Sequence, residues 1–123
     1  MTQENKELLL KDLCARLPYG VKMSVNDNVE VLQGINIVDN IVEYSSFLAS
    51  EIEDCKPYLF PLSSMTEEQE KEYNDLNCYE LGCFPHSEEA LDYLTKNHFD
   101  YRYLIEKGLA IDATGLNIYL KNW

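Results

Sequence analysis

The sequence predicts an α+β fold in which an N-terminal helix and several later helices pack on a small antiparallel sheet. Three observations support this prediction. Apolar residues recur at helical spacing near the N-terminus, they then alternate with polar residues, and helix-capping motifs follow in the second half. A length of 123 residues indicates one domain, 1–123, with a core large enough to fold without disulfides or metal.

The first helix is expected to cover Gln3–Arg16. Thr2 can cap its N-terminus, and Pro18 ends it because a proline disfavours helical backbone at the residue before it. The residues at helical spacing are expected to form one buried stripe, and they are Leu9, Leu10, Leu13, Cys14 and Leu17.

The alternation from Val21 to Tyr44 predicts a three-stranded β-meander, which could be strongly bent or barrel-like. Its strands are expected over 21–25, 29–37 and 41–44, joined by turns at 26–28 and 39–40. Gly34 lies inside the second strand, where a glycine indicates a bulge or a sharp bend.

The pattern after the meander predicts less regular structure. Residues 45–54 have poor periodicity and are expected to form a loop. Pro57 and Pro61 cannot donate ladder hydrogen bonds, so residues 58–60 are predicted to form at most a short edge strand.

The second half is predicted to be mainly helical. Thr66 and Gln69 have the spacing of a capping box, which predicts a helix ending near Leu76. This helix has few apolar residues and is therefore expected at the periphery. The elements expected next are a helix over 88–97 capped by Ser87, a turn over 101–106 capped by Asp100 and closed by Gly108, and a strand over 109–111.

The charge of the chain is strongly negative, with a formal net charge of −12. The segment Glu67–Asp92 contributes nine acids and one base to that total. Such a balance disfavours direct binding to nucleic acid and to anionic membranes. No apolar run approaches the roughly 20 residues that span a bilayer, and the polar N-terminus is unlike a signal peptide. Four cysteines without C-x-x-C spacing predict free thiols and a cytoplasmic location.

Two groups of residues could carry chemistry. Cys78, Cys83, His86 and His98 supply zinc-type ligands, but their spacing does not match common zinc motifs, so we favour unliganded thiols. The segment His98–Arg102 combines an imidazole, a carboxylate, a phenol and a guanidinium, which could serve acid–base catalysis. Capping and ion pairing explain the same residues, and no catalytic motif of a common enzyme class is present. The sequence therefore predicts no catalytic residue and no cofactor.

The leading functional hypothesis is a non-enzymatic accessory or regulatory protein that binds a macromolecular partner, most simply a protein. The acidic helix and nearby aromatic residues would form the contact surface. The candidate residues are Tyr58, Phe60, Glu67, Glu68, Glu70, Glu72, Tyr101 and Arg102. The alternatives are a small metal-dependent or acid–base enzyme, and a homo-oligomer held through an edge strand.

Three segments carry a resemblance to known proteins. Leu8–Val21, Lys56–Glu68 and His98–Ala110 resemble, in the same order, segments of a group of small uncharacterised proteins from Bacteroides-type gut anaerobes, their phages and their mobile elements. The chain departs from that pattern at Phe60, where an arginine is familiar, and at Tyr103, where a glycine is. The resemblance implies a cytoplasmic accessory or regulatory protein that acts on a host factor in a phage-linked version, and it implies no reaction or cofactor.

Overall fold

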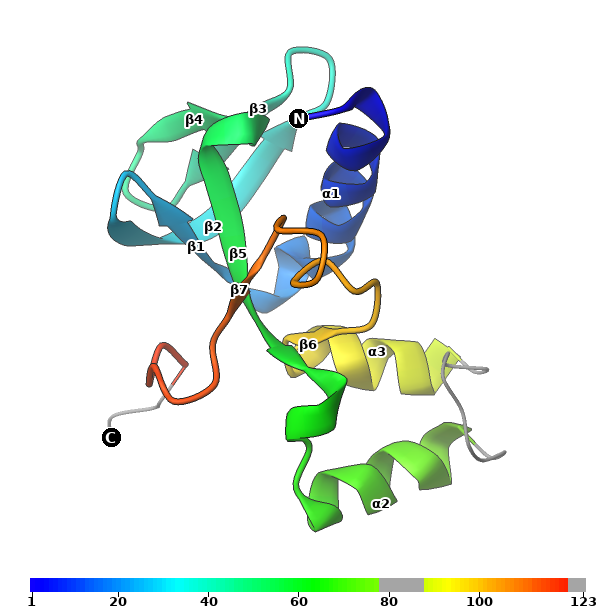
Figure 1. Ribbon diagram of the computed structural model, residues 1–123. Coiled ribbons are helices and arrows are strands. Elements are labelled where there is room, and N and C mark those ends of the chain that lie inside the picture. Colours follow the sequence, from blue (N-terminus) through cyan, green and yellow to red (C-terminus); the bar gives the residue numbers. More distant parts are fainter. Residues whose placement is uncertain (78–87, 120–123) are drawn as a thin grey trace.

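The N-terminal helix is the element that the sequence predicts most closely. The computed structural model describes residues 1–77 and 88–119 (Figure 1), and helix α1 spans Gln3–Arg16. The backbone N–H of Asn5 donates to the Thr2 hydroxyl at 3.1 Å, as expected of an N-cap. The expectation that Cys14 belongs to the core is wrong, because its side chain is exposed.

The sheet confirms the α+β prediction but is larger than the expected meander. The strands are β1 (Lys22–Val25), β2 (Asn28–Asn36), β3 (Ile41–Tyr44), β4 (Ala49–Glu51), β5 (Cys55–Pro61), β6 (Phe99–Asp100) and β7 (Ile111–Asp112). They lie in the order β4-β3-β2-β1-β5-β6, and β7 also pairs with β5. Strands β1 to β5 pair antiparallel, whereas β6 and β7 both run parallel to β5. The sheet is thus mixed, and it does not close into a barrel.

The turns and the bulge of the meander follow the sequence prediction. Asn26 and Asp27 both have positive φ, which is the geometry of a tight two-residue hairpin. The register of β2 against β3 shifts between Leu32 and Gly34, which confirms the predicted bulge. A Cβ on Gly34 would lie 2.9 Å from a carboxylate oxygen of Glu43, so a larger residue here would require the flexible Glu43 side chain to move.

Strand β5 differs most from the prediction. It is a strand of seven residues in the interior of the sheet, not a short edge strand, and Pro57 pairs with Met23 of β1. A proline removes a single donor on one side of a strand, so the rest of the ladder can still form. The segment predicted as a loop, 45–54, also contains strand β4 and a 3₁₀ turn over Ile52–Asp54. The β4 side chains are largely exposed, so this edge strand lacks the alternation that would reveal it.

Two helices lie at the other end of the molecule from β4. Helix α2 spans Glu67–Asn77 and α3 spans Glu88–Lys96, and the two pack against each other (Figure 1). The predicted capping box is present, with reciprocal hydrogen bonds between Thr66 and Gln69 at 2.9 and 3.1 Å. Short 3₁₀ turns also cover Leu17–Tyr19 and Leu62–Ser64.

The buried residues form two clusters. The larger cluster joins α1 to the sheet and contains Leu9, Leu13, Met23 and Leu59, all fully buried. The smaller one joins α2, α3 and β6 through Tyr73, Ala90, Leu94, Phe99 and Tyr101. Strand β5 contributes to both, because Leu59 lies in the first cluster and Phe60 packs against the second.

The segment after β6 is held by the side chain of Asp100. Its two carboxylate oxygens accept hydrogen bonds from the backbone N–H groups of Leu104 and Ile105, both at 2.9 Å. This confirms that Asp100 caps the turn that follows it. The final strand, predicted over 109–111, forms as β7 over Ile111–Asp112 and overlaps the prediction only at Ile111.

Candidate functional site

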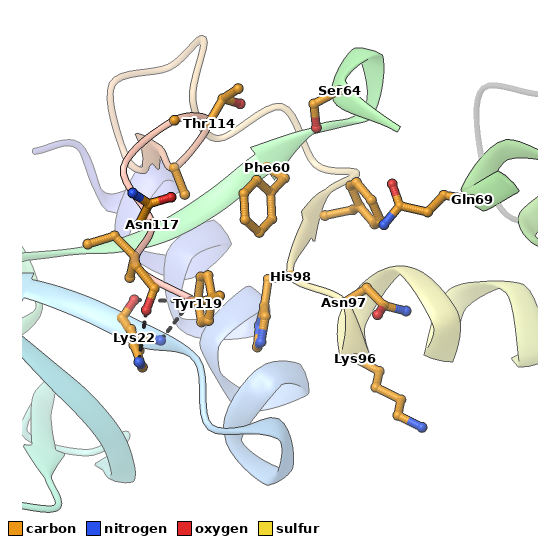
Figure 2. Close-up of a pocket in the computed structure, with 14 residues that line it drawn as sticks. Lys22, Phe60, Ser64, Gln69, Lys96, Asn97, His98, Thr114, Asn117 and Tyr119 are labelled. Carbon is orange, nitrogen blue, oxygen red and sulfur yellow. Dashed lines mark hydrogen bonds between the residues drawn. The ribbon is translucent and has the colours of Figure 1, made fainter. Parts of the chain in front are cut away.

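A hollow lies where the two buried clusters meet. It has a volume of about 950 Å³ and opens between β5, the C-terminal end of α3 and residues 113–119 (Figure 2). Phe60 and Phe99 contribute apolar surface, and Ser64 and Gln69 line the side toward α2. A hollow of this size suits a small-molecule ligand.

His98 and Tyr119 form a stacked pair at this hollow. Their ring centroids lie 3.9 Å apart with an interplanar angle of 13°, and Figure 2 shows the two rings side by side. Phe60 packs against Tyr119 at a centroid distance of 5.7 Å. The Tyr119 hydroxyl accepts from the backbone N–H of Lys22 at 2.7 Å and donates to the Tyr58 carbonyl at 2.8 Å. Tyr119 is therefore fixed at both its ring and its hydroxyl.

His98 has an unusual backbone for a residue that is not glycine. Its φ is 64°, in the left-handed region, directly after the last turn of α3. A side chain raises the energy of this conformation, and glycine is the usual residue at this place in a helix end. The His98 carbonyl also accepts a hydrogen bond from the Phe60 N–H at 2.8 Å, which ties the strained residue to β5.

The His98 imidazole is neutral at neutral pH. Burial, followed by the nearby positive charges of Arg16 and Lys22, lowers the pKa of His98 from 6.5 to about 4. Its Nδ1 atom is buried and has no hydrogen-bond partner among the described residues. Burial likewise raises the pKa of the Tyr119 phenol, so that this ring also stays uncharged.

The charges around the hollow differ in sign from those of the whole chain. Lys22 and Lys96 line it, and the described lining residues include no aspartate or glutamate. Lys22 Nζ donates to the Ile118 carbonyl at 2.8 Å and lies 5.8 Å from the Tyr119 ring centroid. The hollow is thus locally basic in a chain of net charge −12.

A buried ionic network that we did not predict lies between α1 and β6. Asp12 and Arg16 are both fully buried and pair at 2.7 Å, and Arg102 reaches Asp12 at 3.2 Å. Arg16 also donates to the Phe99 carbonyl at 2.6 Å, while its Nη1 atom has no partner among the described residues. Both guanidinium groups lie over the Tyr101 ring, at 5.3 and 4.9 Å.

The spacing of this network could have revealed it. Asp12 and Arg16 are four residues apart and lie on the same helix face as Leu9 and Leu13. Charged residues interleaved with a leucine stripe indicate a buried pair on that stripe. Arg102 completes the network from a segment 90 residues away, which sequence spacing alone does not show.

The structure separates the predicted partner-binding residues into three environments. Glu67, Glu68, Glu70 and Glu72 are exposed on α2. Tyr58 and Phe60 are half-buried on β5, and Phe60 lines the hollow. Tyr101 is only 4% exposed, and Arg102 is half-buried and paired with Asp12. Tyr93, an aromatic residue that is not among the predicted candidates, is half-buried on α3. Burial raises the pKa of its phenol, and the negative charges of Glu72 and Glu68 raise it further.

The candidate metal ligands are only partly within the described chain. Cys78, Cys83 and His86 lie outside the described residues, and His98 stacks on Tyr119. Residues 1–77 and 88–119 contain no group of three or more histidine, cysteine, aspartate or glutamate side chains arranged to hold a metal ion. The same residues include no helix that is both long and apolar enough to cross a membrane.

Comparison with known proteins finds no matching family model, no similar curated protein and no similar solved structure. The resemblance to proteins of Bacteroides-type bacteria and their phages therefore stays a prediction. The acidic surface of α2 and the hollow beside His98 are the two features of the described chain that bear on function.

Proposed function

We propose that this is a non-enzymatic accessory or regulatory protein that binds a basic protein partner through the acidic face of α2. The acidic face is defined as the exposed side chains of Glu67, Glu68, Glu70 and Glu72. The observation that carries the proposal is the packing of α2. Among its described side chains only Tyr73 is buried and Gln69 is half-buried, so most of the helix surface faces solvent.

The negative charge of this face favours binding to a positively charged surface. None of its four carboxylates forms an ion pair with another described residue. Glu67 and Glu70 are three residues apart and Glu68 and Glu72 are four apart on the helix, so the charges within each pair repel each other. A basic partner would relieve that repulsion while speeding association. Tyr93 of the adjacent helix lies near Glu68 and Glu72 and could contribute an aromatic contact of the kind enriched at interfaces.

The placement of the other candidate residues favours binding over catalysis. Asp100 caps a turn, and Arg102 pairs with Asp12. These two groups of the His98–Arg102 segment therefore have structural partners that explain them without a reaction. Of these five residues, His98 and Phe99 line the hollow and the other three do not.

The test is affinity capture from bacterial lysate at low salt with two variants of equal net charge. One variant replaces the four glutamates of the acidic face with glutamine. The control variant makes the same replacement at four exposed acids on α1, β3 and β4, which are Glu4, Glu7, Glu43 and Glu51. The proposal expects a basic protein to be retained by the wild type and the control but lost by the first variant. Equal loss in both variants, or no retained protein, would contradict it.

A second candidate function is self-association through the edge strand β4. Phe47, in the turn before β4, is 95% exposed, has a φ of 70°, and is followed by Leu48 at 56% exposed. A large exposed aromatic side chain beside an unpaired strand edge promotes association with another chain. Light scattering over a range of concentrations would detect a dimer, and Phe47→Ser should abolish it. A monomer at every concentration would remove this candidate.

A further inference from the structure

The hollow beside His98 is separate in its chemistry from the acidic face. It is concave where the face of α2 is convex, and it is lined by Lys22 and Lys96 without a described carboxylate. Neither lysine forms an ion pair with a described residue. The whole chain has a net charge of −12, but this concave surface carries two cations that no described carboxylate compensates. The hollow therefore favours anions locally.

The apolar part of the hollow is aromatic. Phe60 and Phe99 lie 6.2 Å apart at their ring centroids, and Phe60 also contacts Tyr119. Figure 2 shows the Phe60 ring between the rings of His98 and Tyr119 on one side and the segment that carries Ser64 on the other. Aromatic side chains in this arrangement offer faces and edges to another flat ring.

Polar groups that can orient a ligand surround these rings. Gln69 lines the hollow, and its Oε1 atom already accepts from the Thr66 N–H, which fixes the direction of the amide. Asn97 is fixed by its own donation to the Tyr93 carbonyl at 2.9 Å. A small number of fixed polar groups around an apolar floor is the usual composition of a small-molecule site.

The conformation of His98 is a second, independent observation. A left-handed backbone at a non-glycine residue costs stability and tends to persist where the side chain is needed. The ring also keeps one buried nitrogen without a described partner, which costs further stability. Glycine would remove both costs, whereas the imidazole stacks on Tyr119 and places an aromatic ring at the wall of the hollow.

We propose that this hollow binds a small anionic ligand with a flat ring, of the aryl carboxylate or aryl phosphate class. The ring would lie against Phe60 and the His98–Tyr119 stack, and the anionic group would face Lys22 or Lys96. The negative charge of the whole chain opposes anion binding, so a dissociation constant on the order of millimolar is expected for simple probes.

The experiment is an NMR titration of the full chain at low salt with benzoate, phenyl phosphate and uncharged benzamide. The expected result is saturable shifts of the Lys22, Asn97, His98 and Thr114 amides with one or both anions, and at least about fivefold weaker binding of benzamide. The two anions separate a carboxylate site from a phosphate site. No saturation up to about 20 mM, or equal binding of benzamide, would overturn the proposal.

Charge variants distinguish this site from general attraction. Replacing Lys22 and Lys96 with glutamine should weaken anion binding about five- to tenfold, since each solvent-screened charge contributes only a modest attraction. The control replaces Lys11 and Lys107, which are exposed and do not line the hollow. Equal weakening in both would overturn the proposal. If the first variant does not fold, Lys96→Gln alone, at an exposed residue, should still weaken binding about two- to threefold.

Discussion

Acidification tests the environment of His98 directly. In the unfolded chain its imidazole has the ordinary pKa of 6.5, whereas burial and the nearby Arg16 and Lys22 lower the pKa of the folded form to about 4. Between these two values the unfolded state binds a proton that the folded state does not bind. The free energy of unfolding should therefore fall as the pH falls through this window, and His98 should contribute no pH dependence above it.

The size of this effect follows from the two pKa values. For a drop from about pH 7.5 to about pH 5, they give a loss of about 2 kcal/mol, which solvent screening of a half-buried ring reduces to about 1 kcal/mol. The variant for comparison is His98→Asn, because asparagine does not titrate here and tolerates the left-handed backbone at φ 64°.

Urea denaturation of both proteins at the two pH values provides the measurement. His86 and every carboxylate are present in both, so their titration cancels in the comparison. The wild type should lose about 1 kcal/mol more stability than the variant on acidification. If the two lose equal stability, or if the wild type loses less, the neutral buried imidazole is not the correct description.

Three other substitutions or reactions test the interior. Asp12→Ala should lower the free energy of unfolding by about 3 kcal/mol or more, because it leaves Arg16 buried and uncompensated, and adding Arg16→Met should recover part of the loss in urea denaturation. If the double variant loses as much free energy of unfolding as the two single variants together, the buried ion pair is not the cause. Asp100→Ala should cost about 2 kcal/mol in thermal unfolding through two lost backbone hydrogen bonds, and no loss would show that the cap is dispensable. Iodoacetamide should modify exposed Cys14 well before buried Cys55, whose thiol pKa is raised by burial, and peptide mapping should reveal the order; equal rates would contradict the burial of Cys55.

Local rules accounted well for elements whose signals are short-range. The helix Gln3–Arg16 agrees with its prediction because a cap, an apolar stripe and a following proline all act within the helix or next to it. The capping box at Thr66 and the bulge at Gly34 are local in the same sense. Strand β5 was underestimated because its stability comes from partners on both sides, including two strands near the C-terminus.

The candidate site was predicted less well than the fold. The exposed glutamates of α2 could be selected from sequence because a charge-rich helix with few apolar residues has to face solvent. His98 was considered as a metal ligand or an acid–base group, and neither idea indicated that it stacks on Tyr119. That contact joins residues 21 positions apart in the chain, and no periodicity relates them.

The sequence by itself determined the helix, the hairpin turns, the caps and the acidic surface, because each depends on backbone preferences or charge within a few residues. Only the tertiary structure decided which groups are buried together. It placed Asp12 and Arg16 beside Arg102, and it brought His98 and Tyr119 to the end of β5. The physical reason is that desolvation and electrostatic pairing depend on distance in space. The hollow with its neutral imidazole exists only once β5, β6 and residues 113–119 have assembled.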